Sequence, residues 1–533
     1  MDGIGNTESG FAAHAEGLNT TASGTASHSE GYQTTASGNA SHAEGSTTTA
    51  AGAASHTEGY LTNSTIDTAH AEGDSTLASG AAAHAEGYNT NASGIGSHAE
   101  GGETLSSGLY AHAEGQNTSA IGQASHAQGM LSSASGDLSH AEGQSTTASG
   151  VSSHAEGAST IAAGANSHAE GTGSTTTVNG ISAHAEGEGN TASGRASHAE
   201  GGAQDPSGTA APNLSSGPSS HAEGVGTTAS GFASHAEGGT FDITIVQGPQ
   251  AIGDFSHAEG NSTTAIGIAS HAEGIGTIAN GEAPHAEGVG TVAVGIASHA
   301  EGLNTTAFFN GSHIMGQNGQ ARFPFSWHLA NGLMVGPTLN SAVIEGATGN
   351  LYLDGTVISP AAADYAEMFE TFDGNTIDVG YFVTLMDDKV RTAHAEDDYI
   401  LGVVSATPAI IADASDLRWH DLYVKDEWGR IQYHDVVVPE VKDKEGRIII
   451  TSFTKREGQL NPEYDSSKEY IPRLQRIEWI PVGVVGKLLV RDDGTNQAGG
   501  YCWANNEGIA TSSTTGYRVM KRTGPNQILI FVK

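Results

Sequence analysis

Small polar residues alternate with glycine in a strict period through the first three fifths of the chain. The element His-x-Glu-Gly recurs every 14 residues from His14 to His168, continues to His299 and ends at His313. A second glycine stands halfway along most units, as in Thr21-Ala22-Ser23-Gly24. The five or six residues between glycines are too few for a helix, and glycine at this spacing disrupts a helical stripe. The pattern predicts two short strands and two turns per unit, stacked as about 21 coils of a β-solenoid.

The repeat ends near residue 320, where aromatic and basic residues return. Apolar runs such as Tyr381-Phe-Val-Thr-Leu and Ile528-Leu-Ile-Phe-Val are then separated by Gly, Asp and Asn turns, a pattern typical of strands. We therefore predict an all-β protein with a parallel solenoid shaft over 1–320, a connector containing a hairpin over 321–360, and a β-rich domain over 361–533.

The interior of each coil is small. Two strands of four or five residues enclose little more than Ala, Ser and Thr side chains, so one stack buries too little apolar surface to offset its ordering entropy. We expect several chains to associate side by side, although the composition of the coils does not determine how many.

Three insertions interrupt the period, between His168 and His184, His198 and His221, and His235 and His257. The last contains Phe241-Asp-Ile-Thr-Ile-Val, the most apolar segment of the shaft. Insertions in a solenoid emerge at its turns, so these loops are either contact sites or tolerated decoration.

The net charge of the chain limits the kinds of molecule that it can bind. The formal net charge is −38, and the first lysine is Lys389. Such a surface repels phosphate backbones and anionic lipid, so we expect neither nucleic acid binding nor membrane insertion. The first residues resemble no signal peptide, and Cys502 alone makes no disulfide framework. We expect no cofactor.

Histidine and glutamate repeat on one face of the predicted shaft. In a strand, residues i and i+2 share a face, so stacking places His42, His84 and His98 in one column and Glu44, Glu86 and Glu100 in another. We interpret the columns as a structural hydrogen-bond ladder and expect no metal ion. A column of Zn²⁺ or Ni²⁺ and a pH switch based on raised histidine pKa values are the alternatives.

The unit Thr-x-Ala-Ser-Gly-x-x-Ser-His-Ala-Glu-Gly resembles the 14-residue head repeats of YadA-type trimeric adhesins over about 1–316. The resemblance implies a left-handed parallel β-roll that assembles as a homotrimer. Those repeats usually carry apolar residues around the central Ala, where this chain carries His and Glu.

Several ordered blocks after residue 340 resemble the peptidase G2 family of self-cleaving intramolecular chaperone domains. They are Ala363–Glu370, Asp373–Asn375, Val379–Val383, Asp398–Val403 and Asp426–Arg430. The resemblance implies a domain that promotes trimer assembly and then cuts the chain just upstream of its Asp-Tyr-Ala-Glu block.

Carried over by position, Asp364 and Glu367 are the catalytic carboxylates of a single-turnover autoproteolysis. They can converge if the segment forms a helical turn or if a neighbouring chain supplies the second group, and one would then act as base and the other as acid. The alternative is a pair of solvated turn carboxylates. The expected cleavage region is Ser359, Pro360, Ala361, Ala362 and Ala363, with a bond from Pro360 to Ala363 favoured because the Ser359–Pro360 bond is a tertiary amide.

Taken together, the two resemblances imply a virion or prophage fibre of the appendage or tail-spike type. We expect it to bind a host-surface receptor, glycan or protein, and to reach the virion or the extracellular surface without a signal peptide. The alternative is a bacterial or spore surface fibre or adhesin with the same carboxy-terminal chaperone.

Overall fold

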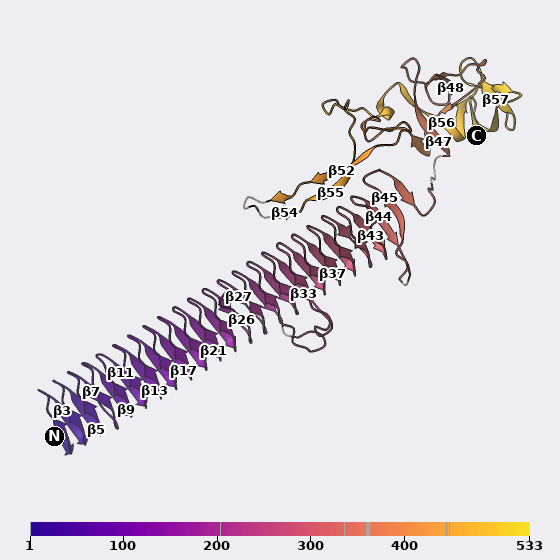
Figure 1. The fold of residues 1–533 in the computed structure, drawn as a ribbon. Helices are drawn as coiled ribbons and strands as arrows, with labels where there is room; N and C mark the ends of the chain where they lie inside the picture. The colour runs from indigo at the N-terminus through magenta and orange to yellow at the C-terminus, as the bar shows by residue number, and fades with distance from the viewer. Residues whose placement is uncertain (1, 203, 335, 359–362, 443–445, 447) are drawn as a thin grey trace. The chain divides into compact units, whose positions relative to one another are not determined.

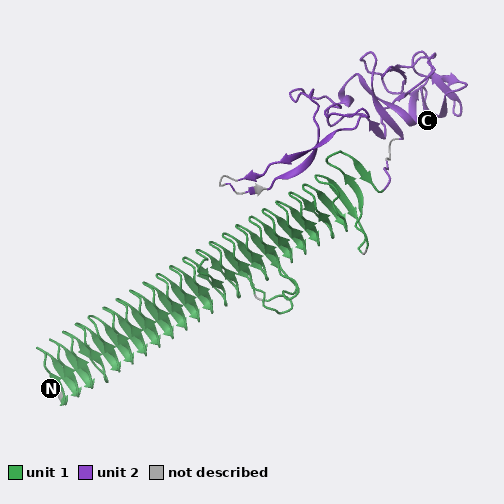
Figure 2. Cartoon of the chain, viewed as in Figure 1, with its two compact units in different colours: residues 1–354 green, residues 355–533 purple. Residues whose placement is uncertain are grey.

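The structure is a computed structural model that describes residues 2–202, 204–334, 336–358, 363–442, 446 and 448–533. The chain divides into two compact units, Met1–Asp354 and Gly355–Lys533 (Figure 2). Among the described residues the one helical element is the short 3-10 helix η1 (Arg473–Gln475). The all-β prediction is confirmed.

The first unit is a parallel β-solenoid (Figure 1). The strands of its first sheet begin at the histidine of each coil, from β3 (His14–Leu18) through β15 (His98–Gly102) to β43 (His313–Gln317). The strands of its second sheet are two residues long, from β2 (Thr7–Glu8) to β42 (Thr306–Ala307). Each residue pairs with its equivalent in the next coil, because the sequence repeats with the period of the coil.

Small side chains fill the coils. Ala99 of the first sheet and Ala92 of the second are fully buried, and the hydroxyl of Ser97 donates to the Gly94 carbonyl oxygen at 2.8 Å. Gly101 lies at φ +101°, where a Cβ would stand 2.2 Å from the Gly115 carbonyl oxygen. The glycine period is therefore required by coil stacking itself.

The shaft is longer than the His-x-Glu-Gly count predicts. Its first sheet has 25 strands, of which 23 are parallel. The additional coils contribute β1 (Asp2–Ile4) and β44 (Trp327–Asn331), which do not carry histidine and glutamate at the positions of the repeat. Two antiparallel strands, β45 (Asn340–Ile344) and β46 (Leu351–Leu353), extend the same sheet. Residues expected to form a separate connector thus continue the first unit as far as Asp354.

Two of the insertions contact each other. One Asp205 carboxylate oxygen accepts hydrogen bonds from the Ser207 and Thr209 amides, and the other accepts from the Ile243 amide at 2.8 Å. Phe241 and Ile245 remain exposed. The inserted segments after His198 and His235 therefore form one joined protrusion from the shaft.

The second unit is built on a ten-stranded sheet. Its strands are β47 (Asp364–Glu370), β48 (Phe382–Met386), β49 (Lys389–Thr392), β50 (Gly402–Val404), β51 (Ile410–Ala412), β56 (Trp479–Arg491), β57 (Tyr501–Ala504), β58 (Ala510–Ser513), β59 (Tyr517–Gly524) and β60 (Gln527–Val532). The long strand β56 pairs with β47, β50 and β60. Phe382, Val490 and Ile528 form part of the core beneath it.

An extended arm leaves this sheet. It contains the pair β52 (Tyr433–Val438) and β55 (Phe453–Gly458), followed by β53 (Val441–Lys442) and β54 (Ile448–Ile450) (Figure 1). Across the parts of the chain that the structure describes, no helix is long and apolar enough to cross a membrane.

Candidate functional site

Asp364 and Glu367 lie on one strand, β47, which pairs antiparallel with β56 and parallel with β51. Asp364, Ala366 and Met368 are buried, whereas Tyr365 and Glu367 are half-buried. Successive side chains of a strand point to opposite faces, so residues three apart do not share a face. The structure therefore does not bring the two carboxylates together within one chain, and residues 364–370 do not form the helical turn that could have done so.

Asp364 is 7% exposed. The Ser405 hydroxyl donates to its Oδ2 atom at 2.6 Å, and the Ala409 amide donates to its backbone carbonyl oxygen at 2.8 Å. The environment of Asp364 thus fixes both the position of its strand and the direction of its carboxylate.

A cavity of about 610 Å³ lies beside Asp364. Ala363, Asp364 and Ser405 line it together with the basic residues Lys487, Arg491 and Lys521. The expected catalytic carboxylate, the residue preceding it and three basic side chains therefore surround one cavity. A water molecule can reach the backbone next to Asp364 from this side.

Gly486 holds Ala363 close to strand β56. The Lys487 amide donates to the Ala363 carbonyl oxygen at 3.3 Å. At Gly486, φ is +120°, and a Cβ would stand 2.3 Å from that carbonyl oxygen and 2.7 Å from the Asp364 Cα atom. Only glycine allows the backbone before Asp364 to approach this closely.

We expect Gly486→Ala to slow self-cleavage at least about tenfold, because displacing a reacting bond by a fraction of an ångström misaligns it with its catalytic groups. Gly499→Ala is the matched control, since Gly499 also has a positive φ, +82°, but its nearest neighbour lies 3.9 Å away. Densitometry of full-length and cut chains over time measures both variants. Equal rates for the two would contradict the role assigned to Gly486.

Glu367 lies on the other face of β47, where the Tyr365 hydroxyl donates to its Oε1 atom at 2.9 Å. This hydrogen bond raises the pKa of the Tyr365 phenol, because the phenol proton is held by the carboxylate. Glu367 is only half-buried, so a group from outside the chain can contact it.

The expected cleavage region falls largely on undescribed residues: Ser359, Pro360, Ala361 and Ala362 lie outside the described residues. Sequence reasoning missed Ser405, Tyr365 and Gly486. Ser405 lies 41 residues from Asp364 and carries no motif, so only the fold brings it near. For Gly486 the sequence offers one weak indication, a glycine inside the apolar run that forms β56.

The histidine and glutamate columns form on the outer face of the first sheet, with Ala directed inward. The rings of His84 and His98 stack with centroids 4.7 Å apart. Within a coil, Nε2 lies 3.9 Å from the carboxylate at His42 and Glu44, 3.7 Å at His84 and Glu86, and 3.9 Å at His98 and Glu100. These separations exceed hydrogen-bond length.

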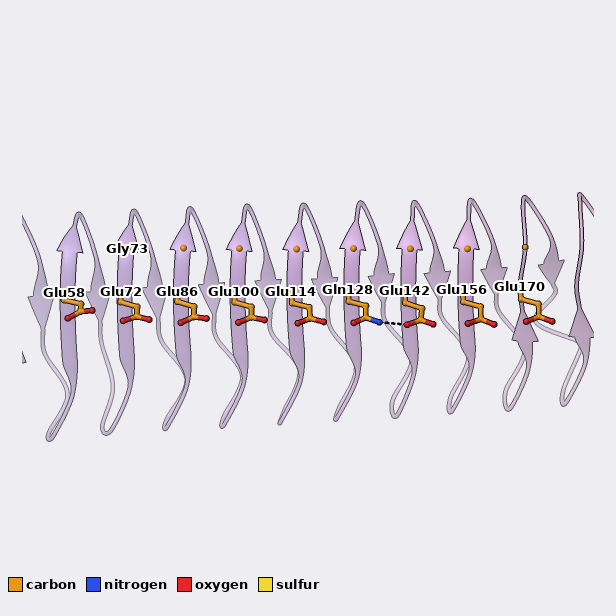
Figure 3. Close-up of a pocket in the computed structure, with 17 residues that line it drawn as sticks. Glu58, Glu72, Gly73, Glu86, Glu100, Glu114, Gln128, Glu142, Glu156 and Glu170 are labelled. Atoms are coloured by element: carbon orange, nitrogen blue, oxygen red, sulfur yellow. Dashed lines mark hydrogen bonds between the residues drawn. The ribbon is translucent and has the colours of Figure 1, made fainter.

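The glutamates also line a groove of about 1300 Å³ together with the adjacent glycines (Figure 3). Gln128 stands in the same row and donates to Glu142. Hydrogen bonding with Glu72 and Glu100 raises the pKa of Glu86 to about 7. Burial, reinforced by the imidazoles of His70 and His98, lowers the pKa of His84. Glu72 and Glu100 raise the pKa of His84, as expected, but burial and the neighbouring imidazoles outweigh them, so the alternative based on a raised histidine pKa does not hold at His84.

Two known families match parts of this chain. Peptidase_G2, IMC autoproteolytic cleavage domain, matches residues 327–527. The YadA head domain repeat (2 copies) matches six segments, 113–139, 141–167, 155–175, 251–268, 258–281 and 286–308.

Curated relatives match over the carboxy-terminal part. The pre-neck appendage protein of Bacillus phage B103 is 37% identical over 163 residues, which is 31% of this chain and 17% of that protein. The pre-neck appendage protein of Bacillus phage phi29 is 34% identical over 176 residues, 32% of this chain and 19% of that protein. The putative phage-related protein YobO of Bacillus subtilis (strain 168) is 37% identical over 184 residues, which is 34% of this chain and 21% of that protein. The chain spans about a fifth of the length of these relatives.

Two solved structures are also similar. The carboxy-terminal fragment of bacteriophage phi29 gene product 12 has 33% identity, covers 32% of this chain and 100% of the fragment, and gives a TM-score of 0.26. The pre-mature phi29 gene product 12 has 16% identity, covers 97% of this chain and 59% of that chain, and gives a TM-score of 0.37. By its family matches, this chain joins YadA head repeats to a carboxy-terminal domain of the Peptidase_G2 family of autoproteolytic cleavage domains.

Proposed function

We propose that the chain is a phage-type trimeric fibre or appendage protein whose second unit assists trimer assembly and then cuts itself from the shaft. The observation that carries the proposal is the placement of Asp364, a buried carboxylate that follows the junction of the two units and faces a cavity. The Peptidase_G2 match and the pre-neck appendage relatives support the same function.

The reaction is hydrolysis of a peptide bond upstream of Asp364, within the region from Pro360 to Ala363. A water oxygen adds to the carbonyl carbon while one carboxylate takes its proton. A second carboxyl group then protonates the departing nitrogen as the C–N bond breaks, which leaves a new carboxylate and a new amine. The reaction turns over once and needs only proximity of the groups.

The second carboxyl group comes from a neighbouring copy. Asp364 and Glu367 of one chain occupy opposite faces of β47, so one chain alone cannot aim both at the same bond. Glu367 lies on the half-buried face, where another copy in a homotrimer can approach. Such an arrangement delays the cut until the trimer has assembled, because an unassembled chain lacks half of the site.

Mixed trimers test this arrangement. Asp364→Asn and Glu367→Gln chains, each with a different tag, are expressed separately and together. Each variant alone stays full length. In mixed trimers the Glu367→Gln chains are cut, since they keep Asp364 beside their own junction and borrow Glu367 from the partner, while the Asp364→Asn chains remain intact.

Two results on gels probed for each tag would contradict the shared site. One is normal cleavage of Glu367→Gln chains expressed alone. The other is mixed trimers in which neither chain is cut, although wild-type chains made in parallel are cut.

We also propose that the fibre is part of the virion and binds a receptor on the host surface. The alternative, a fibre on a bacterial or spore surface, uses the same parts. Attachment of the purified trimer to Bacillus cells supports the phage-type function, because the phage relatives named above are Bacillus phages. A trimer that fails to attach to any Bacillus strain tested argues against it.

A further inference from the structure

The outer face of the shaft carries a row of imidazole nitrogens without hydrogen-bond partners. Among the described residues, Nε2 is buried and unpartnered in His28, His42, His56, His70, His84, His98, His112, His126, His140, His154, His168, His184, His198, His271, His285, His299 and His313. A buried polar atom is normally paired, so its repetition at nearly every coil requires an explanation.

These nitrogens lie close to the carboxylates of the column. His84 Nε2 is 3.8 Å from Glu72 of the preceding coil and 3.7 Å from Glu86 of its own, and His98 Nε2 is 3.8 Å from Glu86 and 3.9 Å from Glu100. Nitrogen and oxygen ligands bind Zn²⁺ at about 2.0–2.2 Å, so two ligand atoms on one tetrahedral ion lie about 3.4 Å apart. The spacing is too long for hydrogen bonds and close to that of atoms that share an ion.

Three coils beside the insertions show the alternative arrangement, one of them through His257 Nε2 and Glu237 at 3.3 Å. His221 Nε2 contacts Glu200 at 2.9 Å, and His235 Nε2 contacts Glu223 at 3.0 Å. The same side chains can therefore close into direct hydrogen bonds. At His84 and His98, whose coils carry no insertion, the same atoms stay 3.7–3.9 Å apart.

Charge favours a cation in the open positions. Nearly every coil adds one glutamate to the column, and the first 320 residues contain a single basic side chain other than histidine, Arg195. One divalent ion for every two coils balances two carboxylates. Because coils are about 4.8 Å apart, successive ions would then lie about 10 Å apart, which keeps their mutual repulsion small.

We propose that the His/Glu face of the shaft binds a row of divalent transition-metal ions, each held by imidazole Nε2 and by carboxylates of successive coils. Groups of this composition, such as His84, Glu86 and His98, recur along the shaft with ligand atoms within 4.8 Å of one another. Imidazole together with carboxylate suits Zn²⁺ and its neighbours, whereas Ca²⁺ and Mg²⁺ prefer oxygen alone. The ions would tie the His and Glu side chains of successive coils together, which His–Glu hydrogen bonds do not do at the observed distances.

The test uses the full chain, stripped with EDTA and titrated with ZnCl₂, with bound zinc measured by elemental analysis. We expect about ten zinc ions per chain and a higher melting temperature, with no such effect from MgCl₂. The test variant, called the six-fold variant, carries glutamine in place of six glutamates of the column: Glu58, Glu72, Glu86, Glu100, Glu114 and Glu142. Gln128 shows that the column accommodates this residue.

The variant is expected to lose about three zinc ions per chain, half the number of glutamates removed. The control carries Glu103→Gln and Glu188→Gln, two exposed glutamates outside the column, and should keep the wild-type stoichiometry. Circular dichroism verifies that all chains fold. Failure of the stripped chain to bind several zinc ions, or equal zinc content in the six-fold variant and the control, would overturn the proposal. Neither result depends on self-cleavage.

Discussion

A chain carrying Asp364→Asn is expected to stay at its full 54.1 kDa on a denaturing gel while wild-type chains are cut. Asparagine keeps the size of the side chain but cannot take or give a proton at neutral pH. Loss of one general acid or base slows a reaction by about 10² to 10⁴, so no cut chain should accumulate in the time that wild type needs for completion.

The control for this variant is Glu396→Gln, an exposed carboxylate in the segment His394-Ala395-Glu396, which imitates the shaft motif. It should cleave as wild type does. The melting temperature of both variants shows whether the second unit remains folded. Cleavage of folded Asp364→Asn at the wild-type rate would remove Asp364 from the catalytic site.

The shaft provides the other large effect. Gly101→Ala should destabilise the fibre by about 2–4 kcal/mol, because the new Cβ meets the Gly115 carbonyl oxygen at 2.2 Å and the residue is held at φ +101°. The obstacle is backbone of the next coil, which cannot move without breaking the ladder. The lost stability is measured as a lower midpoint of urea unfolding.

The adjacent residue supplies the comparison. Gly102 belongs to the same strand and lacks the positive φ, and a Cβ added there would meet no atom within 4 Å. Gly102→Ala should therefore unfold at the wild-type midpoint. If both alanine variants were equally stable, the stacking requirement would not be the reason for the glycine period.

Sequence reasoning predicted the shaft well because its determinants are local and repeated. The glycine spacing rules out helices, and one register places His84 beside His98 along the whole stack. The count of coils was two short, since β1 and β44 build the same coil without histidine and glutamate at the column positions. A coil can therefore form without the His-x-Glu-Gly motif, because the hydrogen bonds between hydroxyls and carbonyls inside the coils do not involve it.

The candidate site was predictable only in part. The Asp-Tyr-Ala-Glu block pointed to Asp364 and Glu367. The spacing of these two residues fits either a helical turn or a strand, and the segment is a strand because it pairs with β56. Ser405 reaches Asp364 through the fold alone. The distances between His84 and its glutamates depend on coil geometry, which the residue pattern does not specify.

The most direct measurement is the intact mass of the purified wild-type protein together with its native mass. Assembly followed by self-cleavage gives two fragments with a new amino terminus just upstream of Asp364, and a native shaft containing three copies. A single uncut species of 54.1 kDa that is monomeric in solution would contradict both assembly and cleavage.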